Sequence, residues 1–124
     1  MNKILVVDDD LDILDVLRFL LKKNGYDVVA LSEAQKVIET VKEAHPDIML
    51  LDINLSGYDG REICKYLKTT LNSKTPVILF SANISYKNSY KDSLADDFLE
   101  KPFEVKKLLS LLRAHLPVSE GSPR

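Results

Sequence analysis

Residues 46–57, PDIMLLDINLSG, indicate the fold of this chain. The apolar run from Ile48 to Leu51 is bounded by polar and turn residues, which is typical of a strand buried on both faces of a parallel sheet. Asp52 follows that run directly. Open parallel sheets bind ligands just beyond the carboxyl ends of their strands. A carboxylate at that place is costly to desolvate unless a cation shares the site, so we expect a cationic partner from elsewhere in the chain.

The composition fits one small globular domain. The chain has 124 residues, of which 45% are hydrophobic and 29% are charged, and it is too short for two ordinary domains. A formal net charge of -2 argues against a nucleic-acid or membrane-surface binder. No apolar run approaches the roughly 20 residues that span a bilayer. Cys64 is the only cysteine, which fits a reducing compartment. We therefore expect a cytoplasmic domain with no nucleic-acid or membrane partner.

Strand patterns alternate with helical patterns along the chain. Besides 48–51, apolar runs predict strands at 4–7 and 77–80, and we expect further strands at 26–31 and 97–99. Apolar residues at helical spacing predict helices over 11–23, 33–44, 59–71 and 105–116, and we expect a short helix within 84–94. Five such alternations predict an α/β fold, (βα)5, with a doubly wound five-stranded parallel sheet and helices on both faces. We assign residues 1–117 to this domain and 118–124 to a flexible C-terminal tail.

Polar residues gather at one edge of the predicted sheet. Right-handed crossovers place the carboxyl ends of all strands together, and Asp8, Asp9, Asp52, Ser81 and Lys101 lie at or just beyond these ends. Three carboxylates in one cleft repel one another unless a hard cation such as Mg²⁺ lies among them. Lys101 adds a positive charge and Ser81 a hydroxyl donor. In such a site a carboxylate could attack phosphorus and form an aspartyl phosphate.

Four short motifs occur in a recognisable order: Val7-Asp8-Asp9, Leu51-Asp52-Ile53-Asn54, Ser81-Ala82 and Lys101-Pro102-Phe103. With them, the chain from Lys3 to about Leu116 resembles the CheY-like receiver domain of two-component response regulators. The resemblance implies a flavodoxin-like fold with strand order 2-1-3-4-5. It also implies that Asp52 accepts a phosphoryl group from a histidine kinase or phosphotransfer protein. The chain would then be a signalling phosphoacceptor and not an enzyme, apart from self-catalysed phosphotransfer and autodephosphorylation.

The resemblance further implies a metal site with two amides near it. Asp9, Asp52 and the backbone carbonyl of Asn54 would bind Mg²⁺, or Mn²⁺ in its place, and Asp8 would help through a water molecule. The side chains of Asn54 and Asn83 would flank the phosphoryl group. We hypothesise that these two amides orient a hydrolytic water and so tune the lifetime of the phosphorylated state.

A switch is also implied by the resemblance. Lys101 would contact Asp52 and then the phosphoryl oxygens, with a cis peptide bond to Pro102, and the backbone of Ala82 would contact the phosphoryl group. Ser81 would move toward that group and Phe98 would swing inward. These movements would alter the face formed by 84–94, 97–99 and 105–116, where an unknown downstream protein would bind. We expect a monomer or weak dimer.

We expect a stand-alone receiver without a DNA-binding output, because nothing after Leu116 could form an effector domain. Two other functions stay open. A haloacid-dehalogenase-like phosphatase also forms an aspartyl phosphate. That family, however, carries a second acid two residues after its nucleophile on the first strand, whereas Asn54 follows Asp52 on the third. A phosphorylation-independent interaction module of the same fold would lack an acid or the lysine, and none is missing. Ser56 stands where the family usually has proline, so we expect a less rigid loop after Asp52.

Overall fold

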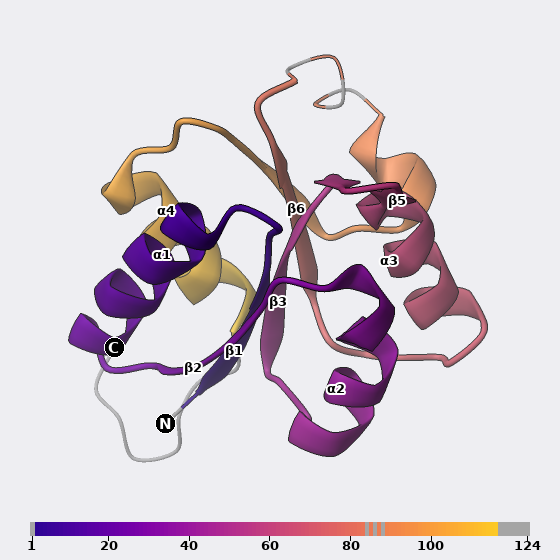
Figure 1. Cartoon of the computed structure of the whole chain (residues 1–124), viewed down its shortest axis with the longest axis horizontal. Helices are drawn as coiled ribbons and strands as arrows, with labels where there is room; N and C mark the ends of the chain where they lie inside the picture. The colour runs from indigo at the N-terminus through magenta and orange to yellow at the C-terminus, as the bar shows by residue number, and fades with distance from the viewer. Residues whose placement is uncertain (1, 84, 86, 88, 117–124) are drawn as a thin grey trace.

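A five-stranded parallel sheet forms the centre of the structure, a computed structural model that describes residues 2–83, 85, 87 and 89–116 (Figure 1). The strands are β1 (Lys3–Val7), β2 (Asp27–Leu31), β3 (Ile48–Asp52), β6 (Val77–Ser81) and β7 (Asp97–Glu100). They lie in the order β2-β1-β3-β6-β7, and every neighbouring pair is parallel. The predicted order 2-1-3-4-5 is therefore confirmed. All residues of β3 and β6 are buried, as their continuous apolar runs predict.

Helices cover both faces of this sheet, as Figure 1 shows. One face carries α1 (Leu11–Lys23) and α4 (Val105–His115), and the other carries α2 (Val37–Ala44) and α3 (Gly60–Thr69). Side chains alternate along each strand, so the core has two halves. Ile4 and Val6 of β1 pack in the half that includes the buried leucines of α1 and α4. Leu5 and Val7 pack in the half that includes α2 and α3.

The helix expected within 84–94 differs from the structure. In the described part of that segment, Tyr90–Ser93 forms a 3₁₀ helix, η3, and Leu94 ends it with a φ of 68°. The part of the chain that the structure describes therefore holds four α-helices, where the sequence predicted five. The segment is rich in serine and lysine and has few apolar residues to bury, so it lacks the stripe that holds a longer helix against a core. A 3₁₀ turn, η1 (Ala34–Lys36), likewise precedes α2. The predicted tail, 118–124, lies outside the described residues.

A small hairpin follows β3. Its strands are β4 (Asn54–Leu55) and β5 (Tyr58–Asp59), which pair antiparallel with Leu55 opposite Tyr58. Ser56 and Gly57 form the two-residue turn, with φ values of 37° and 92°. Two successive positive φ values are typical of the hairpin turns whose twist matches the flanking strands. The loop after Asp52 closes in a turn whose conformation proline could not adopt at position 56, and its expected lower rigidity stays a prediction.

Among the described residues, no helix combines the length and the apolar character needed to cross a lipid bilayer.

Candidate functional site

The polar side chains singled out from the sequence lie at one edge of the sheet. Asp8 and Asp9 follow β1, Asp52 is the last residue of β3 and Ser81 is the last residue of β6. Lys101 follows β7, and its backbone N–H donates to the carbonyl of Ser81 at 2.9 Å. Parallel strands bring these ends together from four separate parts of the chain. The structure therefore places all five residues where the sequence predicted them to meet.

Three carboxylates form a cluster at this edge. One oxygen from each of Asp8, Asp9 and Asp52 lies within 4.8 Å of the other two. Asp8 is fully buried and Asp52 is 5% exposed, whereas Asp9 is exposed to solvent. The cluster is thus an oxygen-rich site with one open side. Such a site suits a hard cation that keeps several of its waters.

Lys101 joins the two buried acids. Its Nζ donates to Oδ2 of Asp8 at 2.7 Å and lies 3.3 Å from Oδ2 of Asp52. The same ammonium lies 4.5 Å from the ring centroid of Phe80, so an aromatic face adds to its stabilisation. The other oxygen of Asp8 accepts from the backbone N–H of Asp10 at 2.9 Å. Lys101 is the cation expected beside Asp52, and its shorter contact is with Asp8.

Asp52 has a perturbed acidity. Burial raises the pKa of Asp52 most, and the nearby negative charge of Asp8 raises it further. The positive charge of Lys101 and hydrogen bonds from Lys101 and the Asn54 backbone act in the opposite direction. The net result is a pKa of about 6, compared with 3.8 for an ordinary aspartate. An ionised Asp52 is therefore held at an energetic cost in the metal-free protein, which an added cation would offset.

The hydroxyl and amide groups beside the acids are arranged by local hydrogen bonds. The backbone N–H of Asn54 donates to Oδ1 of Asp52 at 3.3 Å. The buried Oγ of Ser81 accepts from the backbone N–H of Asn83 at 3.1 Å. The side-chain oxygen of Asn83 accepts from both the backbone N–H and the hydroxyl of Ser85, at 3.0 and 2.7 Å. Asn83 is thus engaged with Ser85, and its predicted place beside a phosphoryl group stays a prediction.

Phe98 lies inside the protein. It is 7% exposed and its ring stacks on Tyr90 of η3, with 6.1 Å between ring centroids. The structure shows one position of this side chain, so the predicted switch of Phe98 and Ser81 stays a prediction. The peptide bond between Lys101 and Pro102 is cis, and Ala82 is exposed directly after β6.

The sequence did not reveal two contacts of this site. Gly60 begins α3 against the backbone of Asp52, and a Cβ at position 60 would overlap the Asp52 carbonyl oxygen. The hydroxyl of Ser56 donates to Oδ2 of Asp9. In the sequence, Gly60 indicates only a turn and Ser56 only a departure from proline. A glycine eight residues after a strand-end acid, at a helix start, was the available signal for the first contact.

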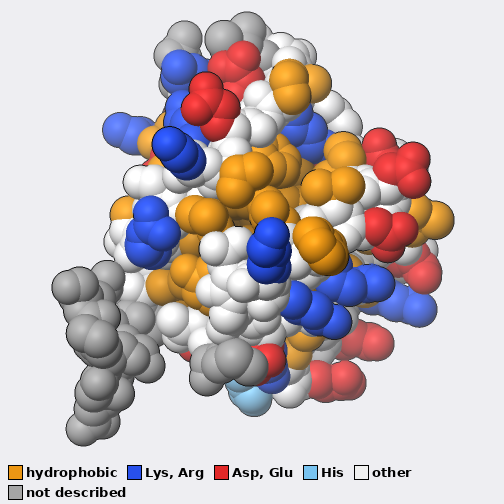
Figure 2. Space-filling model, turned by 90° about the vertical axis from the view of Figure 1, so that its left-hand side faces the viewer, with side chains coloured by type: hydrophobic (Ala, Val, Ile, Leu, Met, Phe, Trp, Pro, Cys, Tyr) orange, Lys and Arg blue, Asp and Glu red, His pale blue; other side chains and the backbone are white. Residues whose placement is uncertain are grey.

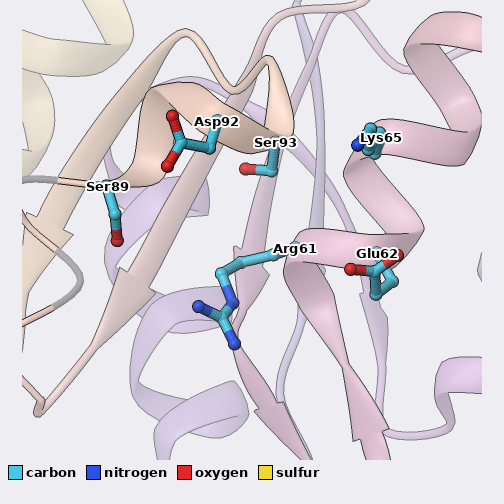
Figure 3. Close-up of a pocket in the computed structure, with 6 residues that line it drawn as sticks. All are labelled: Arg61, Glu62, Lys65, Ser89, Asp92 and Ser93. Atoms are coloured by element: carbon cyan, nitrogen blue, oxygen red, sulfur yellow. The ribbon is translucent and has the colours of Figure 1, made fainter.

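Away from the carboxylate cluster, a hollow of about 240 Å³ lies between α3 and η3 (Figure 3). Arg61, Glu62 and Lys65 line it from α3, and Ser89, Asp92 and Ser93 line it from the other side. Its charges are of both signs, and Arg61 already forms two hydrogen bonds with the side chain of Asp59. None of the predicted site residues lines this hollow, so the carboxylate cluster is the candidate site.

Fold and site together define a receiver. Residues 4–113 match the family model described as the response regulator receiver domain. The chain belongs to that family, whose members are the phosphorylation-controlled receivers of two-component signal transduction. Receiver domains bind Mg²⁺ at such an acidic cluster and interact with histidine kinases or phosphotransfer proteins.

Solved structures agree with this assignment. The chain is 29% identical to the BeF3-activated N-terminal receiver domain of Klebsiella pneumoniae RstA, with a TM-score of 0.86 and coverage of 94% of this chain and 100% of that one. It is 30% identical to the NtrX receiver domain of Brucella abortus (TM-score 0.83, coverage 94% and 99%). A CheY-like receiver protein of Methanospirillum hungatei is 27% identical (TM-score 0.84, coverage 92% of both chains). In a longer NtrX chain the match covers only 27% of the length, so the stand-alone architecture expected above stays a prediction.

Proposed function

We propose that this chain is the phosphoacceptor of a two-component pathway, in which Asp52 takes a phosphoryl group from a histidine kinase or phosphotransfer protein. The observation that carries the proposal is the convergence of Asp8, Asp9 and Asp52 within 4.8 Å, with Lys101 in contact with two of them. The chain is itself modified by the reaction, so it acts as a signalling switch and not as an enzyme with turnover.

The donor set fits Mg²⁺. Asp9, Asp52 and the backbone carbonyl of Asn54 would hold the ion, and Mn²⁺ could replace it because it accepts the same oxygen ligands. Both oxygens of Asp8 already have partners, in Lys101 and the backbone of Asp10, which supports contact through water. When bound, the ion neutralises charge on the phosphoryl oxygens. The exposed side of Asp9 leaves room for the waters that Mg²⁺ retains.

The protein's own groups would carry the transfer. An oxygen of the Asp52 carboxylate forms a bond to phosphorus, and the bond from phosphorus to the donor histidine nitrogen breaks, leaving that nitrogen with the electron pair. Lys101 bridges Asp8 and Asp52 in this structure and can turn toward the new phosphoryl oxygens while it keeps Asp8. The backbone of Ala82 and the side chain of Asn54 are exposed beside the site and can contact the same oxygens.

The output would be a change of protein contacts. Ser81 lies at the end of β6, and Phe98 of the neighbouring strand β7 pairs with Leu79 of β6, so movement at one strand can reach the other. Phe98 also stacks on Tyr90, which links β7 to η3. We propose that the downstream protein binds the face formed by η3, β7 and α4, whose equilibrium between two states the phosphoryl group shifts.

The phosphodonor would approach over the α1 side of the site. Figure 2 shows apolar side chains gathered on the face of α1 and α4, with charged side chains of both signs around them. An apolar groove of about 450 Å³ on this face is lined by Ile13, Val16, Leu20, Pro102, Phe103 and Val105. Ala82 and Lys101 also line it, so the groove adjoins the acceptor site. A protein that brings its histidine to Asp52 must cover this border, and the exposed apolar side chains suit such a contact.

Acetyl phosphate with Mg²⁺ tests the proposal. Intact mass should increase by one phosphoryl group, and the increase should vanish in Asp52→Asn and in the presence of excess EDTA. Turnover of diverse small phosphate esters would instead favour the phosphatase. Absence of modification from acetyl phosphate and from phosphohistidine donors would favour the phosphorylation-independent module.

A further inference from the structure

A hydroxyl from the β4–β5 hairpin contacts the carboxylate cluster. Oγ of Ser56 donates to Oδ2 of Asp9, although the two residues lie 47 positions apart in the sequence. Across the described ranges 2–83, 85, 87 and 89–116, no other hydrogen-bond or ion-pair partner of the Asp9 carboxylate is found. The serine thus ties the one solvent-exposed acid of the cluster to the loop that follows Asp52.

The turn makes this contact possible. Ser56 has a φ of 37° and Gly57 a φ of 92°, which closes the hairpin between Leu55 and Tyr58. Leu55 is 2% exposed and anchors the hairpin in the core. Packing and turn geometry therefore place the backbone of Ser56 where its hydroxyl reaches Asp9.

Asp9 depends on such a contact more than its neighbours do. Asp8 is fixed by Lys101 and the backbone of Asp10, and Asp52 by Lys101 and the backbone of Asn54. An exposed aspartate without a partner samples several rotamers, and fixing it on metal binding costs conformational entropy. A carboxylate can accept a hydrogen bond on one oxygen and ligate a cation with the other.

We propose that Ser56 is a positioning residue for the Mg²⁺ site: its hydroxyl orders the Asp9 carboxylate for the cation. This inference rests on the proposed function, because it assumes that Mg²⁺ binds among these acids. Groups that orient a ligand from outside the coordination shell commonly change metal affinity by about 10–100-fold when they are removed. An exposed position should give the low end of that range, so loss of the hydroxyl should weaken Mg²⁺ binding by about tenfold.

Two substitutions separate the hydroxyl from the turn. Ser56→Gly removes the donor but accepts a positive φ without strain, so the hairpin should persist. Ser56→Asn also tolerates a positive φ and restores a side-chain N–H donor. Both replacements suit the turn. A difference in Mg²⁺ affinity between Ser56→Gly and Ser56→Asn would therefore come from the side-chain donor and not from the turn.

The experiment is a Mg²⁺ titration of wild type, Ser56→Gly and Ser56→Asn, followed by NMR at the backbone amides of residues 52–54, with thermal unfolding in EDTA as the fold control. We expect about tenfold weaker binding for Ser56→Gly, a smaller loss for Ser56→Asn and little change in metal-free stability. Wild-type affinity, or a higher one, in Ser56→Gly would overturn the inference and leave the proposed function intact. If the wild type bound no Mg²⁺ at these amides, the proposed function itself would be wrong.

Discussion

Replacing Asp52, the proposed acceptor, with asparagine should stabilise the metal-free protein at neutral pH. Asp52 is 5% exposed, and burial with the neighbouring charge of Asp8 raises its pKa from 3.8 to about 6. Between these two values the native state binds more protons than the unfolded state, so this group makes stability fall as pH rises toward 6. Above that pH the cost stays constant. An asparagine side chain at this position would have no charge to bury, and Lys101 would keep its 2.7 Å contact with Asp8.

The size of the effect follows from the change in pKa. A rise from 3.8 to about 6 corresponds to a cost of about 3 kcal/mol at pH 8. Part of this free-energy cost is already present at pH 5. The difference in unfolding free energy between Asp52→Asn and wild type should therefore grow by about 1.4 kcal/mol from pH 5 to pH 8. For a domain of this size that is about 5 °C in Tm. Urea unfolding in EDTA, followed by circular dichroism because the chain has no tryptophan, measures the difference.

The comparison across pH removes any fixed effect of the amide itself. Asp15→Asn is a matched control, because Asp15 is exposed on α1 and its ion pair with Arg18 has a length of 3.9 Å. Its difference from wild type should stay flat across the same range. A flat or falling difference for Asp52→Asn would refute the reasoning that Asp52 is ionised at a cost in the metal-free protein.

Other substitutions test the surroundings of Asp52. Gly60→Ala should displace the backbone of Asp52 and reduce phosphorylation by acetyl phosphate by about tenfold or more, since its Cβ would overlap a carbonyl oxygen; intact mass after a fixed time measures this. Val16→Glu should slow transfer from a histidine phosphotransfer protein that modifies the wild type, while labelling by acetyl phosphate stays unchanged, because Val16 is 59% exposed in the apolar groove. An equal loss of phosphorylation with the phosphotransfer protein and with acetyl phosphate would show that Val16→Glu does not act on docking. Replacing Asn54 and Asn83 together by leucine should slow decay of the phosphorylated state by roughly tenfold if their amides orient water; an unchanged decay rate would contradict that role.

The fold was predictable because its signals are local. Short, mainly apolar segments indicated every strand of the five-stranded sheet, and their alternation with helices indicated the parallel topology. The segment 84–94 gave no such signal. Tyr90 packs on Phe98 by a tertiary contact, so local spacing could not predict a 3₁₀ helix at Tyr90–Ser93.

The meeting of the site residues was predictable for the same topological reason, but their pairing was not. Both Asp8 and Asp52 lie within reach of Lys101, and only the backbone geometry decides that the shorter contact is with Asp8. The contact between Ser56 and Asp9 depends on a turn with positive φ, which serine rarely adopts and which the sequence therefore did not suggest.

A crystal structure of this chain with Mg²⁺ and BeF₃⁻ tests the central claim most directly. The account predicts the beryllium on the carboxylate of Asp52, the ion between Asp9, Asp52 and the carbonyl of Asn54, and Nζ of Lys101 turned toward a fluoride. A beryllofluoride group on another side chain, or an ion bound without Asp9 and Asp52, would contradict it.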